Sequence, residues 1–469
     1  MTQTSVVTKK ERSPRKLPML PTGPLQAVRA MRRDPLSLLR RVADECGGVG
    51  GFRLGPQLVA VVSSPDLIHE VLVERPGEFV RGRIQRRVLG AVMGDGLLVS
   101  EGELHAKQRR LVLPHFVPRR IGRHVEVMVQ EAERRIATWP ESRELDLLAE
   151  MNALTMDIVT KLLFSSRLED NQRLADAITE VLSWEMRAVA SPVPLPMSVP
   201  TPGNRRARAA LTFVRDWFQR QVDQRRAEPD AHPDDLLGLL LASRYEDGGA
   251  MPDKLLIDEV LTLWGAAQET SADAQAWTCY LLATHPDVYE RARQEVDSVL
   301  GGRPVTHADL PRLPYTLQVF KESLRMYPPA AALMREAARD TEVGGVRIRR
   351  HTLVLVSPYA LHHRPELYPE PARFDPDRFT RERESALPRH AFLPFGTGKH
   401  VCVGNHLAMM EGHVLTATLV QRVEVSVPPS YRAEPELVIN IRPRGGLPAR
   451  ITHRPGNPFR DTTKEGSAS

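Results

Sequence analysis

Apolar residues recur at helical spacing along most of the chain, whereas the alternation typical of strands is confined to short segments. This spacing predicts helices over Asp34–Glu45, Glu131–Phe164, Asn171–Val189, Arg205–Arg225 and Leu317–Met326, and one that begins at Ser64-Pro65-Asp66. The longest predicted helix begins at Pro252-Asp253 and ends before His285-Pro286. Roughly 30 residues at about 1.5 Å each give about 45 Å, enough to cross a whole domain. Its middle, Leu261–Ala267, is apolar on most sides, so we expect a buried core helix.

Short strands are predicted near both ends of the chain. They cover Gly51–Leu54 and Leu58–Val62 (a hairpin around Gly55-Pro56), Val343–Ile348, Thr352–Val356, and a terminal hairpin made of Leu437–Ile441 and the segment after Gly445-Gly446. The predicted fold class is therefore mainly α with a smaller β region. One domain is expected over residues 25–455, between a disordered, basic and Pro-rich tail (1–24) and a polar tail (456–469).

Composition narrows the classes of protein that fit. The chain has 469 residues, of which 42% are hydrophobic, so it can bury a sizeable core. The formal charge of +6 suits an acidic partner protein, and without a nucleic-acid-binding motif we expect no nucleic-acid partner. Cys46, Cys279 and Cys402 are far apart and odd in number, which argues against a disulfide framework and fits a reducing cytoplasm. The basic stretch Met1–Lys16 has no apolar run that could span a membrane or act as a secretory signal.

Candidate chemistry is concentrated in the loop Ala391–Met410, which contains Cys402. Gly396 and Gly398 allow tight turns, and an apolar helical pattern begins near Asn405. Cys402 therefore lies just before a helix N-terminus, where the unpaired N–H groups and the dipole favour a thiolate. A small buried cysteine at a turn is the ordinary alternative for any isolated cysteine.

The spacing F-x-x-G-x-H-x-C-x-G, from Phe395 through His400 and Cys402 to Gly404, resembles the haem-binding loop of the cytochrome P-450 family. The resemblance implies the P-450 fold, haem b as cofactor, and Cys402 as the thiolate ligand of the haem iron, which favours O–O cleavage. It assigns His400 to a haem propionate and makes Phe395 and Gly404 part of the haem-binding loop. Eukaryotic members usually carry an N-terminal anchor, so the chain resembles the soluble bacterial type.

Further motifs of the family occur at other positions. His105 and Arg109 are four residues apart and match H-x-x-x-R, whose side chains meet haem propionates in the family, although alone the pair indicates only a surface helix. Arg335 matches another propionate-binding position. By the same resemblance, four basic residues lie near the proximal face and could receive an acidic electron-transfer protein: Lys107, Arg110, Arg119 and Arg120.

The long helix carries A-A-Q-E-T at Ala266–Thr270, which is similar to the family pattern A-G-x-E-T. In the family this acid–alcohol pair delivers protons for the reduction of dioxygen, so Glu269 and Thr270 are the candidate catalytic residues. The structural alternative is that Glu269 reaches a cation and Thr270 bonds back to a carbonyl. Ala267 stands where the family commonly has glycine, and its methyl group could narrow the oxygen groove.

Two shorter motifs point to a structural role. Glu322 and Arg325 form E-x-x-R, which in isolation indicates an exposed ion pair. P-A-R-F-D-P-D-R-F, from Pro371 to Phe379, lies downstream. In the family Arg378 of this segment joins Glu322 and Arg325 in a buried structural triad that fixes the cysteine loop.

The resemblance also locates a substrate pocket. Arg81–Met93 lies over the haem in the family, and its arginines could meet a substrate carboxylate, although a solvated loop face is the simpler interpretation: Arg81, Arg83, Arg86 and Arg87. Ser191–Gly203 is either a linker between domains or, by resemblance, a lid over the substrate channel. The tip of the terminal hairpin is expected to enter the pocket. The apolar lining candidates are Val88, Trp264, Ala266, Ala330 and Leu333.

We therefore predict a haem-thiolate monooxygenase that inserts one atom of O2 into a lipophilic small molecule, by hydroxylation or epoxidation. A fatty acid, terpenoid, carotenoid or other secondary metabolite fits the apolar pocket. No flavin or iron–sulfur segment follows the last strands, so we expect electrons from NAD(P)H through a separate ferredoxin or flavodoxin with its reductase. The protein itself is expected to be a cytoplasmic monomer. The alternatives are a peroxide-driven peroxygenase, an oxygen-independent isomerase, a haem sensor, and a helical binding protein without haem. The Glu269–Thr270 pair argues against the first two.

Overall fold

The computed structural model describes residues 14–141, 143–165, 172–190, 195–228 and 235–454. Its helices are α1 Pro24–Arg33, α2 Pro35–Cys46, α3 Pro65–His69, α4 Arg83–Met93, α5 Gly102–Val112, α6 Pro118–Ile121, α7 Val125–Ala137, α8 Leu147–Phe164, α9 Gln172–Ala190, α10 Pro202–Ala227, α11 Leu236–Ala242, α12 Asp253–Thr284, α13 Pro286–Leu300, α14 Pro314–Met326, α15 Pro358–His362, α16 Arg381–Ala386 and α17 Asn405–Arg422. Its strands are β1 Val49–Leu54, β2 Gln57–Val62, β3 Phe79–Val80, β4 Leu145–Asp146, β5 Leu333–Ala337, β6 Thr341–Val343, β7 Val346–Ile348, β8 Leu353–Val356, β9 Val423–Ser426, β10 Pro435–Leu437, β11 Ile441–Pro443 and β12 Pro448–His453.

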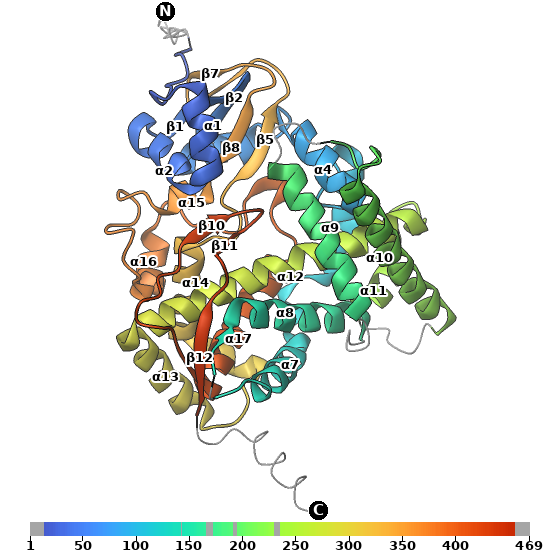
Figure 1. Cartoon of the computed structure of the whole chain (residues 1–469), viewed down its shortest axis with the longest axis vertical. Helices are drawn as coiled ribbons and strands as arrows, with labels where there is room; N and C mark the ends of the chain where they lie inside the picture. The colour runs from blue at the N-terminus through green and yellow to red at the C-terminus, as the bar shows by residue number, and fades with distance from the viewer. Residues whose placement is uncertain (1–13, 142, 166–171, 191–194, 229–234, 455–469) are drawn as a thin grey trace, which may run out of the picture.

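Strands from both halves of the chain form one five-stranded sheet in the order β1-β2-β8-β5-β3 (Figure 1). β1 and β2 form the antiparallel hairpin that the sequence predicted. β2 pairs in parallel with β8, with Val59 opposite Leu353, and β5 pairs antiparallel with β8, with Arg335 opposite Val354. The sheet thereby fixes the position of Arg335 relative to the N-terminal part of the chain.

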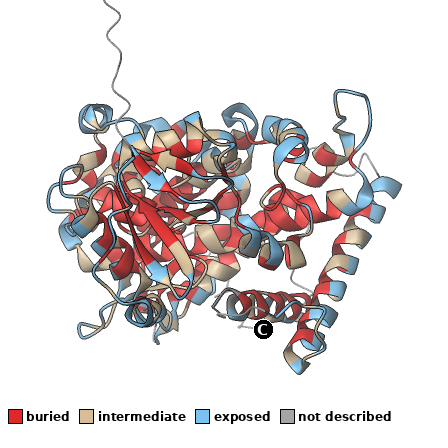
Figure 2. Ribbon diagram, turned by 90° about the horizontal axis from the view of Figure 1, so that it is seen from above, coloured by how far each residue is buried: buried red, intermediate tan, exposed pale blue. Residues whose placement is uncertain are grey.

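The long helix α12 runs through the helical part of the molecule with α8 packed along it (Figure 1). It has 32 residues, and its two ends are those predicted. Every residue from Leu256 to Trp264 is buried, which confirms a core helix. One hydrophobic cluster joins α12 to α7, α8, α13, α14 and α17, and a second joins it to α4, α8, α9, α10 and α11. Figure 2 shows buried residues continuing from the sheet into the helices, with exposed residues on the outer faces.

Three predicted elements were wrong. Glu131–Phe164 is interrupted between α7 and α8, because Pro140 cannot continue a helix and the Asp146 carboxylate caps α8 by accepting from the Leu148 N–H at 3.1 Å. Val343–Ile348 is not one strand, because Gly344 and Gly345, with φ of +56° and +70°, turn the chain between Val343, the end of β6, and β7, Val346–Ile348.

The predicted terminal hairpin also differs in its pairing. Leu437 pairs with Ile441, so this segment folds on itself as β10–β11. β12 instead pairs with β9 and β4. The turn of β10–β11 contains Asn440, whose amide reaches α12 and donates to Glu269 Oε2 at 3.3 Å.

Residues 14–23, which the sequence analysis placed in a disordered tail, are hydrogen-bonded to the sheet. The Arg15 N–H donates to Gly345 O and the Leu20 N–H to Gly51 O, each at 2.8 Å, and Leu20 is buried. Residues 14–23 therefore lie along the sheet, and α1 begins at Pro24. Residues 1–13 and the predicted tail 456–469 lie outside the described residues.

Candidate functional site

The cysteine loop is held by its glycines and by one backbone hydrogen bond. Gly396 and Gly398 have φ of +70° and +73°, and a Cβ on Gly398 would lie 2.1 Å from the carbonyl oxygen of Leu72. The Cys402 N–H donates to Phe395 O at 3.0 Å, which closes the loop. Only glycine fits at residue 398, because its backbone approaches the π-helical turn Glu70–Glu74 closely.

The Cys402 side chain is accessible, although protein atoms surround it closely. The residue is exposed, yet desolvation by the surrounding protein raises the pKa of the thiol. Protein atoms therefore surround the sulfur closely although part of the residue is accessible. The Gly404 N–H and the Arg109 guanidinium act in the opposite direction and favour the thiolate. The sulfur is therefore a recessed ligand atom directly before α17.

Three side chains from distant segments meet beside this loop. Arg81 Nη2 lies 3.0 Å from His400 Nδ1, and His105 Nε2 lies 3.1 Å from the same nitrogen. His400 Nε2 in turn lies 3.3 Å from a Glu101 carboxylate oxygen. This geometry assigns the His400 proton to Nε2, since Nδ1 must accept from Arg81. Burial, then the nearby cations, lower the pKa of His105 to about 3, so His105 is neutral at pH 7.

Two more guanidinium groups complete this cation cluster of Arg81, His105, Arg109, Arg335 and His400. Arg109 Nη1 donates to Val401 O at 2.8 Å, and the buried Arg335 lies close enough to Arg81 for its charge to lower the Arg81 pKa. Burial is the larger cause of that shift, to about 10. Glu101 is the carboxylate that faces the cluster, so positive charge is in excess even without the half-exposed Lys399. Arg81 Nη1 is buried without a hydrogen-bond partner among the described residues.

Sequence reasoning missed two members of this site. Arg81 was grouped with three other arginines as a solvated face or a substrate ligand, but only Arg81 of the four is buried, while Arg83, Arg86 and Arg87 on α4 are exposed. Glu101 was not singled out, although its carboxylate accepts from the Arg81 N–H at 2.9 Å. Neither residue has a local sequence signal, since the cluster is assembled from residues 81 to 400.

The predicted acid–alcohol pair lies where α12 becomes accessible again. Ala266 is exposed, and Gly265, Ala267, Glu269 and Thr270 are partly exposed, in the middle of a helix that is otherwise buried. The Thr270 hydroxyl donates to Ala266 O at 2.8 Å, as the structural alternative expected. Its lone pairs remain free to accept a hydrogen bond. Burial raises the pKa of Glu269, and Arg442 partly offsets the increase.

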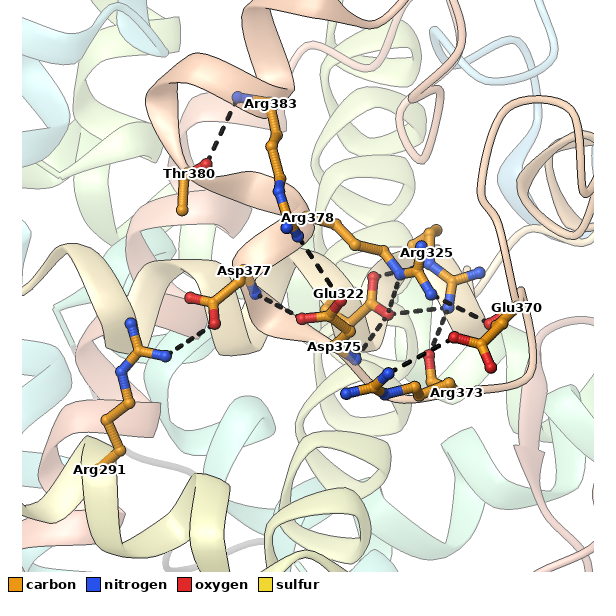
Figure 3. A network of polar contacts seen from close by, with 10 residues as sticks. All are labelled: Arg291, Glu322, Arg325, Glu370, Arg373, Asp375, Asp377, Arg378, Thr380 and Arg383. Atoms are coloured by element: carbon orange, nitrogen blue, oxygen red, sulfur yellow. Dashed lines mark hydrogen bonds and ion pairs between the residues drawn. The ribbon is translucent and has the colours of Figure 1, made fainter.

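The three predicted scaffold residues are in contact (Figure 3). Arg325 donates from Nε to Glu322 Oε2 at 2.6 Å and from Nη2 to Oε1 at 2.9 Å, and neither side chain is exposed at all. Arg378 Nε lies 3.3 Å from Glu322 Oε1. Arg325 Nη1 also donates to His362 O at 2.9 Å, and His362 Nε2 accepts from the Leu393 N–H at 2.8 Å. The triad is thus connected to the segment that leads into the cysteine loop.

The predicted pocket residues separate into two groups. Trp264 donates from Nε1 to Thr160 Oγ1 at 3.1 Å and its ring meets Phe218 edge-on, so it faces α8 and α10. We therefore correct its assignment to the core. Val88 is buried in the same cluster. Ala266 is exposed, Ala330 and Leu333 are partly exposed, and Leu333 approaches Gly396 of the cysteine loop. These three remain candidates for a pocket wall.

The predicted lid segment is tied to the helices on either side of it. Within 195–203, the part that is described, the carbonyl oxygens of Pro196 and Val199 accept from Asn204 Nδ2 at 2.9 and 2.8 Å. Trp184 of α9 donates to Asn204 Oδ1 at 2.8 Å, and α9 packs against α10. These contacts do not fit a linker between independent domains.

A sequence model of the cytochrome P450 family matches residues 13–443. The chain belongs to the cytochrome P450 family. Cyclooctatin synthase of Streptomyces melanosporofaciens is a P450 relative that is 35% identical over 417 residues, which cover 88% of this chain and 89% of the relative. Cyclooctat-9-en-7-ol 5-monooxygenase of the same organism is 35% identical over 395 residues, covering 84% and 85%. Pentalenene oxygenase of Streptomyces avermitilis is 33% identical over 426 residues, covering 90% and 94%.

Solved P450 structures share the fold. The cytochrome P450DA heme domain superposes with a TM-score of 0.85 at 24% identity, covering 95% of this chain and 99% of that one. The retinoic acid bound cyanobacterial CYP120A1 gives a TM-score of 0.83 at 24% identity, covering 94% and 100%. The predicted fold class, mainly α with a smaller β region in the P450 arrangement, is confirmed.

Family membership establishes the class of chemistry. P450 proteins use haem iron and O2, draw electrons from redox partners and bind lipophilic substrates, so this chain is an oxidoreductase of the P450 monooxygenase type. The donor set fits haem, because the excess positive charge and the unpartnered Arg81 Nη1 match a group with two carboxylates. Across the described ranges, no helix combines the length and apolarity needed to cross a bilayer.

Proposed function

We propose that this P450 is a haem-thiolate monooxygenase with haem b, in which Cys402 would supply the thiolate ligand of the iron. One observation supports the assignment above the others: the recessed but accessible Cys402 sulfur lies beside a buried cluster with excess positive charge. Haem bound there supplies the activation of O2, assisted by electron donation from the thiolate. The flanking Phe395 and Gly404 close the loop around the ligand.

The cation cluster holds the two haem propionates in this proposal. Arg109 and Arg335 bind carboxylates as charged forks of donors, and His400 offers the N–H of Nε2, which has no hydrogen-bond partner among the described residues. His105 supports the His400 ring, with its Nε2 3.1 Å from His400 Nδ1. Arg81 joins them through its free Nη1. A buried cluster of this kind destabilises the fold when no anion is bound, because each buried charge has lost its hydration. Haem binding therefore stabilises the fold locally as well as supplying the reactive centre.

Glu269 and Thr270 manage protons during oxygen reduction. The Thr270 hydrogen is already donated to Ala266 O, so the hydroxyl acts as an acceptor that positions a protonated group or a water molecule. Glu269, whose pKa burial raises, supplies the proton. Ala267 is partly exposed beside them, and its methyl group leaves less space at this point of α12 than a glycine would.

The substrate we propose is a terpenoid hydrocarbon or terpenoid alcohol, which is hydroxylated or epoxidised. Of three relatives that cover most of the chain, two are named cyclooctat-9-en-7-ol 5-monooxygenase and pentalenene oxygenase, and the third is named cyclooctatin synthase. The accessible side chains around the site, Ala266, Ala330 and Leu333, are aliphatic and suit a lipophilic molecule. Fatty acids and carotenoids are the comparison substrates, because they share the apolar character without the compact ring shape.

Electrons reach the haem from NAD(P)H through a ferredoxin or flavodoxin and its reductase, with the P450 acting as a cytoplasmic monomer. The exposed basic residues Lys107, Arg110, Arg119 and Arg120 suit an acidic partner. Leu113 and Val117, about 40% and 39% exposed, add apolar contact area between them. Charge reversal at Arg119 and Arg120 should lower the rate of reduction and its salt dependence together.

The reduced carbon monoxide spectrum tests the ligand assignment. The wild-type protein should show the far-red-shifted Soret band that a thiolate opposite carbon monoxide produces. Cys402→Ala should lose this band, whereas the matched control Cys46→Ala should keep it. A Cys402→Ala spectrum equal to that of the wild type would overturn the proposal.

Substrate class is tested by spin-state titration of the oxidised protein. Terpenoid hydrocarbons and alcohols should shift the haem spectrum at lower concentration than fatty acids or carotenoids. Turnover is then compared between O2 with a reductase system and hydrogen peroxide alone. Tighter binding of fatty acids, or equal turnover with peroxide alone, would contradict the proposed substrate or reaction respectively.

A further inference from the structure

The β10–β11 hairpin is anchored between α12 and the segment that leads into β5 (Figure 1). The Ile441 N–H donates to Pro329 O at 2.9 Å, and Ile441 O accepts from Trp277 Nε1 at 3.0 Å. Both polar groups of the Ile441 backbone are therefore held by neighbouring elements. Asn440, the last residue of the turn, is thereby fixed next to Pro329 and Ala330, where the candidate pocket wall begins.

The side-chain amide of Asn440 is oriented by α12. Its Nδ2 donates to Glu269 Oε2 at 3.3 Å. Asp273 follows one helical turn later on the same face of α12, so a second carboxyl group lies on this side of the amide. Carboxyl oxygens accept from the amide NH2 group and repel the amide oxygen. This arrangement assigns Nδ2 to the α12 side and leaves Oδ1 for another partner.

The Asn440 side-chain oxygen is an accessible acceptor. Within the described ranges it accepts no hydrogen bond, and it keeps accessible surface, unlike the two enclosed and unpartnered oxygens of Asp273. The residue as a whole is only 8% exposed. Its partner Glu269 belongs to the stretch of α12 that is accessible again after a buried run, in which Ala266 is exposed. Oδ1 is therefore a fixed polar atom beside an aliphatic wall.

A single acceptor in such a place distinguishes between ligands that carry a donor and ligands that do not. A hydrocarbon that covers Oδ1 removes its hydration and offers no hydrogen bond in return, which costs free energy. A hydroxyl group replaces the lost water by donating its O–H. A site with one oriented polar group among apolar side chains therefore selects a hydroxylated ligand and also fixes its orientation.

We propose that Asn440 binds a hydroxyl group of the substrate through Oδ1 and thereby selects a terpenoid alcohol over the parent hydrocarbon. This assignment rests on the proposed function, because it refines the substrate class of the same site. Glu269 orients the amide, and Asn440 itself contacts the substrate. The bound hydroxyl lies on the Glu269–Thr270 side of the site, so the carbon to be oxidised is at a fixed separation from it.

Binding of two matched ligands tests the assignment without turnover. The probes are cedrol and cedrane, which share one terpenoid skeleton and differ by the hydroxyl group. Equilibrium dialysis of the holoprotein, followed by gas chromatography, gives both dissociation constants without the haem spectrum. The ratio of the cedrane constant to the cedrol constant should fall about tenfold in Asn440→Leu. Differences in ligand solubility cancel, because both proteins are compared with the same two ligands.

The matched control is Glu434→Gln, at the end of the same hairpin that is opposite the turn. Glu434 is exposed and pairs there with Arg444 at 2.9 Å, so its substitution should leave the ratio at the wild-type value. Asn440→Ala is a second truncation and should lower the ratio as Asn440→Leu does. A purely structural amide would weaken the binding of both ligands by the same factor, and this unchanged ratio would overturn the proposal.

Product analysis gives a second readout. The anchored hydroxyl determines which carbon is presented for oxidation, so the share of the major cedrol product should be larger in the wild type than in Asn440→Leu. Glu434→Gln should keep the wild-type share. An equal share in all three proteins would contradict anchoring by Asn440.

A second pair of ligands, 1-dodecanol and dodecane, separates this proposal from the proposed function. If only this acyclic pair binds and its ratio falls in Asn440→Leu, hydroxyl recognition is supported and the terpenoid class is wrong. If cedrol is oxidised but its ratio to cedrane is the same in both proteins, the role of Asn440 alone is rejected. If none of the four ligands binds to the wild type, both proposals are overturned.

Discussion

Arg81 donates from Nη2 to His400 Nδ1 at 3.0 Å, while its other terminal nitrogen, Nη1, is buried with no hydrogen-bond partner in the described part of the chain. The two residues are 319 positions apart in sequence. Half of the guanidinium fork is therefore used to orient a loop residue, and half is available for an anion. A free buried donor of this kind is rare in folded proteins and calls for a ligand.

Arg81→Gln should weaken haem binding by about 10- to 100-fold, because a hydrogen bond to a charged group contributes about 1.5–3 kcal/mol. The measurement is the rate of haem loss to an excess of a haem-scavenging protein. Arg83→Gln, on the exposed face two residues later, is the control and should lose haem at the wild-type rate. Equal rates for all three proteins would remove Arg81 from the propionate site.

Gly398→Ala should displace the cysteine loop. The new Cβ would lie 2.1 Å from Leu72 O, and φ is +73°. Gly445→Ala separates the two effects, because Gly445 has φ of +74° but no atom within 4 Å of its Cβ. Backbone strain should lower the free energy of unfolding of both variants by about 1 kcal/mol. Only Gly398→Ala should also lose part of the intensity of the thiolate carbon monoxide band. Matching spectra for the two variants would show that the contact is unimportant.

Glu322→Gln should destabilise the protein by about 3–5 kcal/mol, since it leaves the fully buried Arg325 without its counter-charge. Urea unfolding of the holoprotein gives the change in the free energy of unfolding. Glu45→Gln is the control, because its pairing with Arg41 is solvent-exposed and worth about 0–1 kcal/mol. A loss for Glu322→Gln no larger than the control would contradict the structural role of the triad.

Thr270→Ala should keep its haem and the thiolate spectrum but divert electrons to hydrogen peroxide. The substitution removes the acceptor lone pairs beside Glu269 without touching the cation cluster. Thr278→Ala is closely matched, since the Thr278 hydroxyl also donates to the carbonyl four residues earlier, at 2.8 Å, but is fully buried. Peroxide formed per electron should rise several-fold for the first variant only. Unchanged coupling in Thr270→Ala would remove the proton-relay assignment.

Buried histidines should make the fold sensitive to acid. Burial lowers the pKa of His413 to about 4, below the ordinary value of 6.5. Between these values the unfolded chain binds a proton that the folded chain does not, so stability falls as the pH drops from 6.5 toward 4. This histidine should contribute a loss of about 2 kcal/mol at pH 5 relative to pH 7. Urea unfolding should show a smaller loss for His413→Gln, and the wild-type loss for His307→Gln at an exposed position.

Local sequence patterns were sufficient for the elements whose determinants are close in the chain. The ends of α12 were predicted because an uninterrupted helical pattern begins at Pro252 and stops before His285-Pro286. The β1–β2 hairpin followed from its turn residues. The interruption after α7 was missed because apolar residues recur at helical spacing on both sides of Pro140, and this pattern was given more weight than the proline. The pairing of β12 was missed because its partners, β4 and β9, are non-local.

The residues of the candidate site also separate into those predicted from short local motifs and those whose surroundings depend on tertiary packing. The spacing around Cys402, and the pairs His105–Arg109, Glu269–Thr270 and Glu322–Arg325, were visible because each is a short motif on one element. Whether Trp264 faces a pocket or the core was not visible, because the apolar residues surround α12 on most sides.

The amino-acid sequence by itself determined the family, the ligand loop and the helix that crosses the domain, because motif spacing and apolar period are properties of neighbouring residues. Only the tertiary structure decided that Arg81 and Glu101 join His400, and that Asn440 reaches Glu269. The physical reason is that the charge state of a buried group depends on the solvent it loses and on the charges that packing brings near it. Neither quantity is encoded at any one position of the chain.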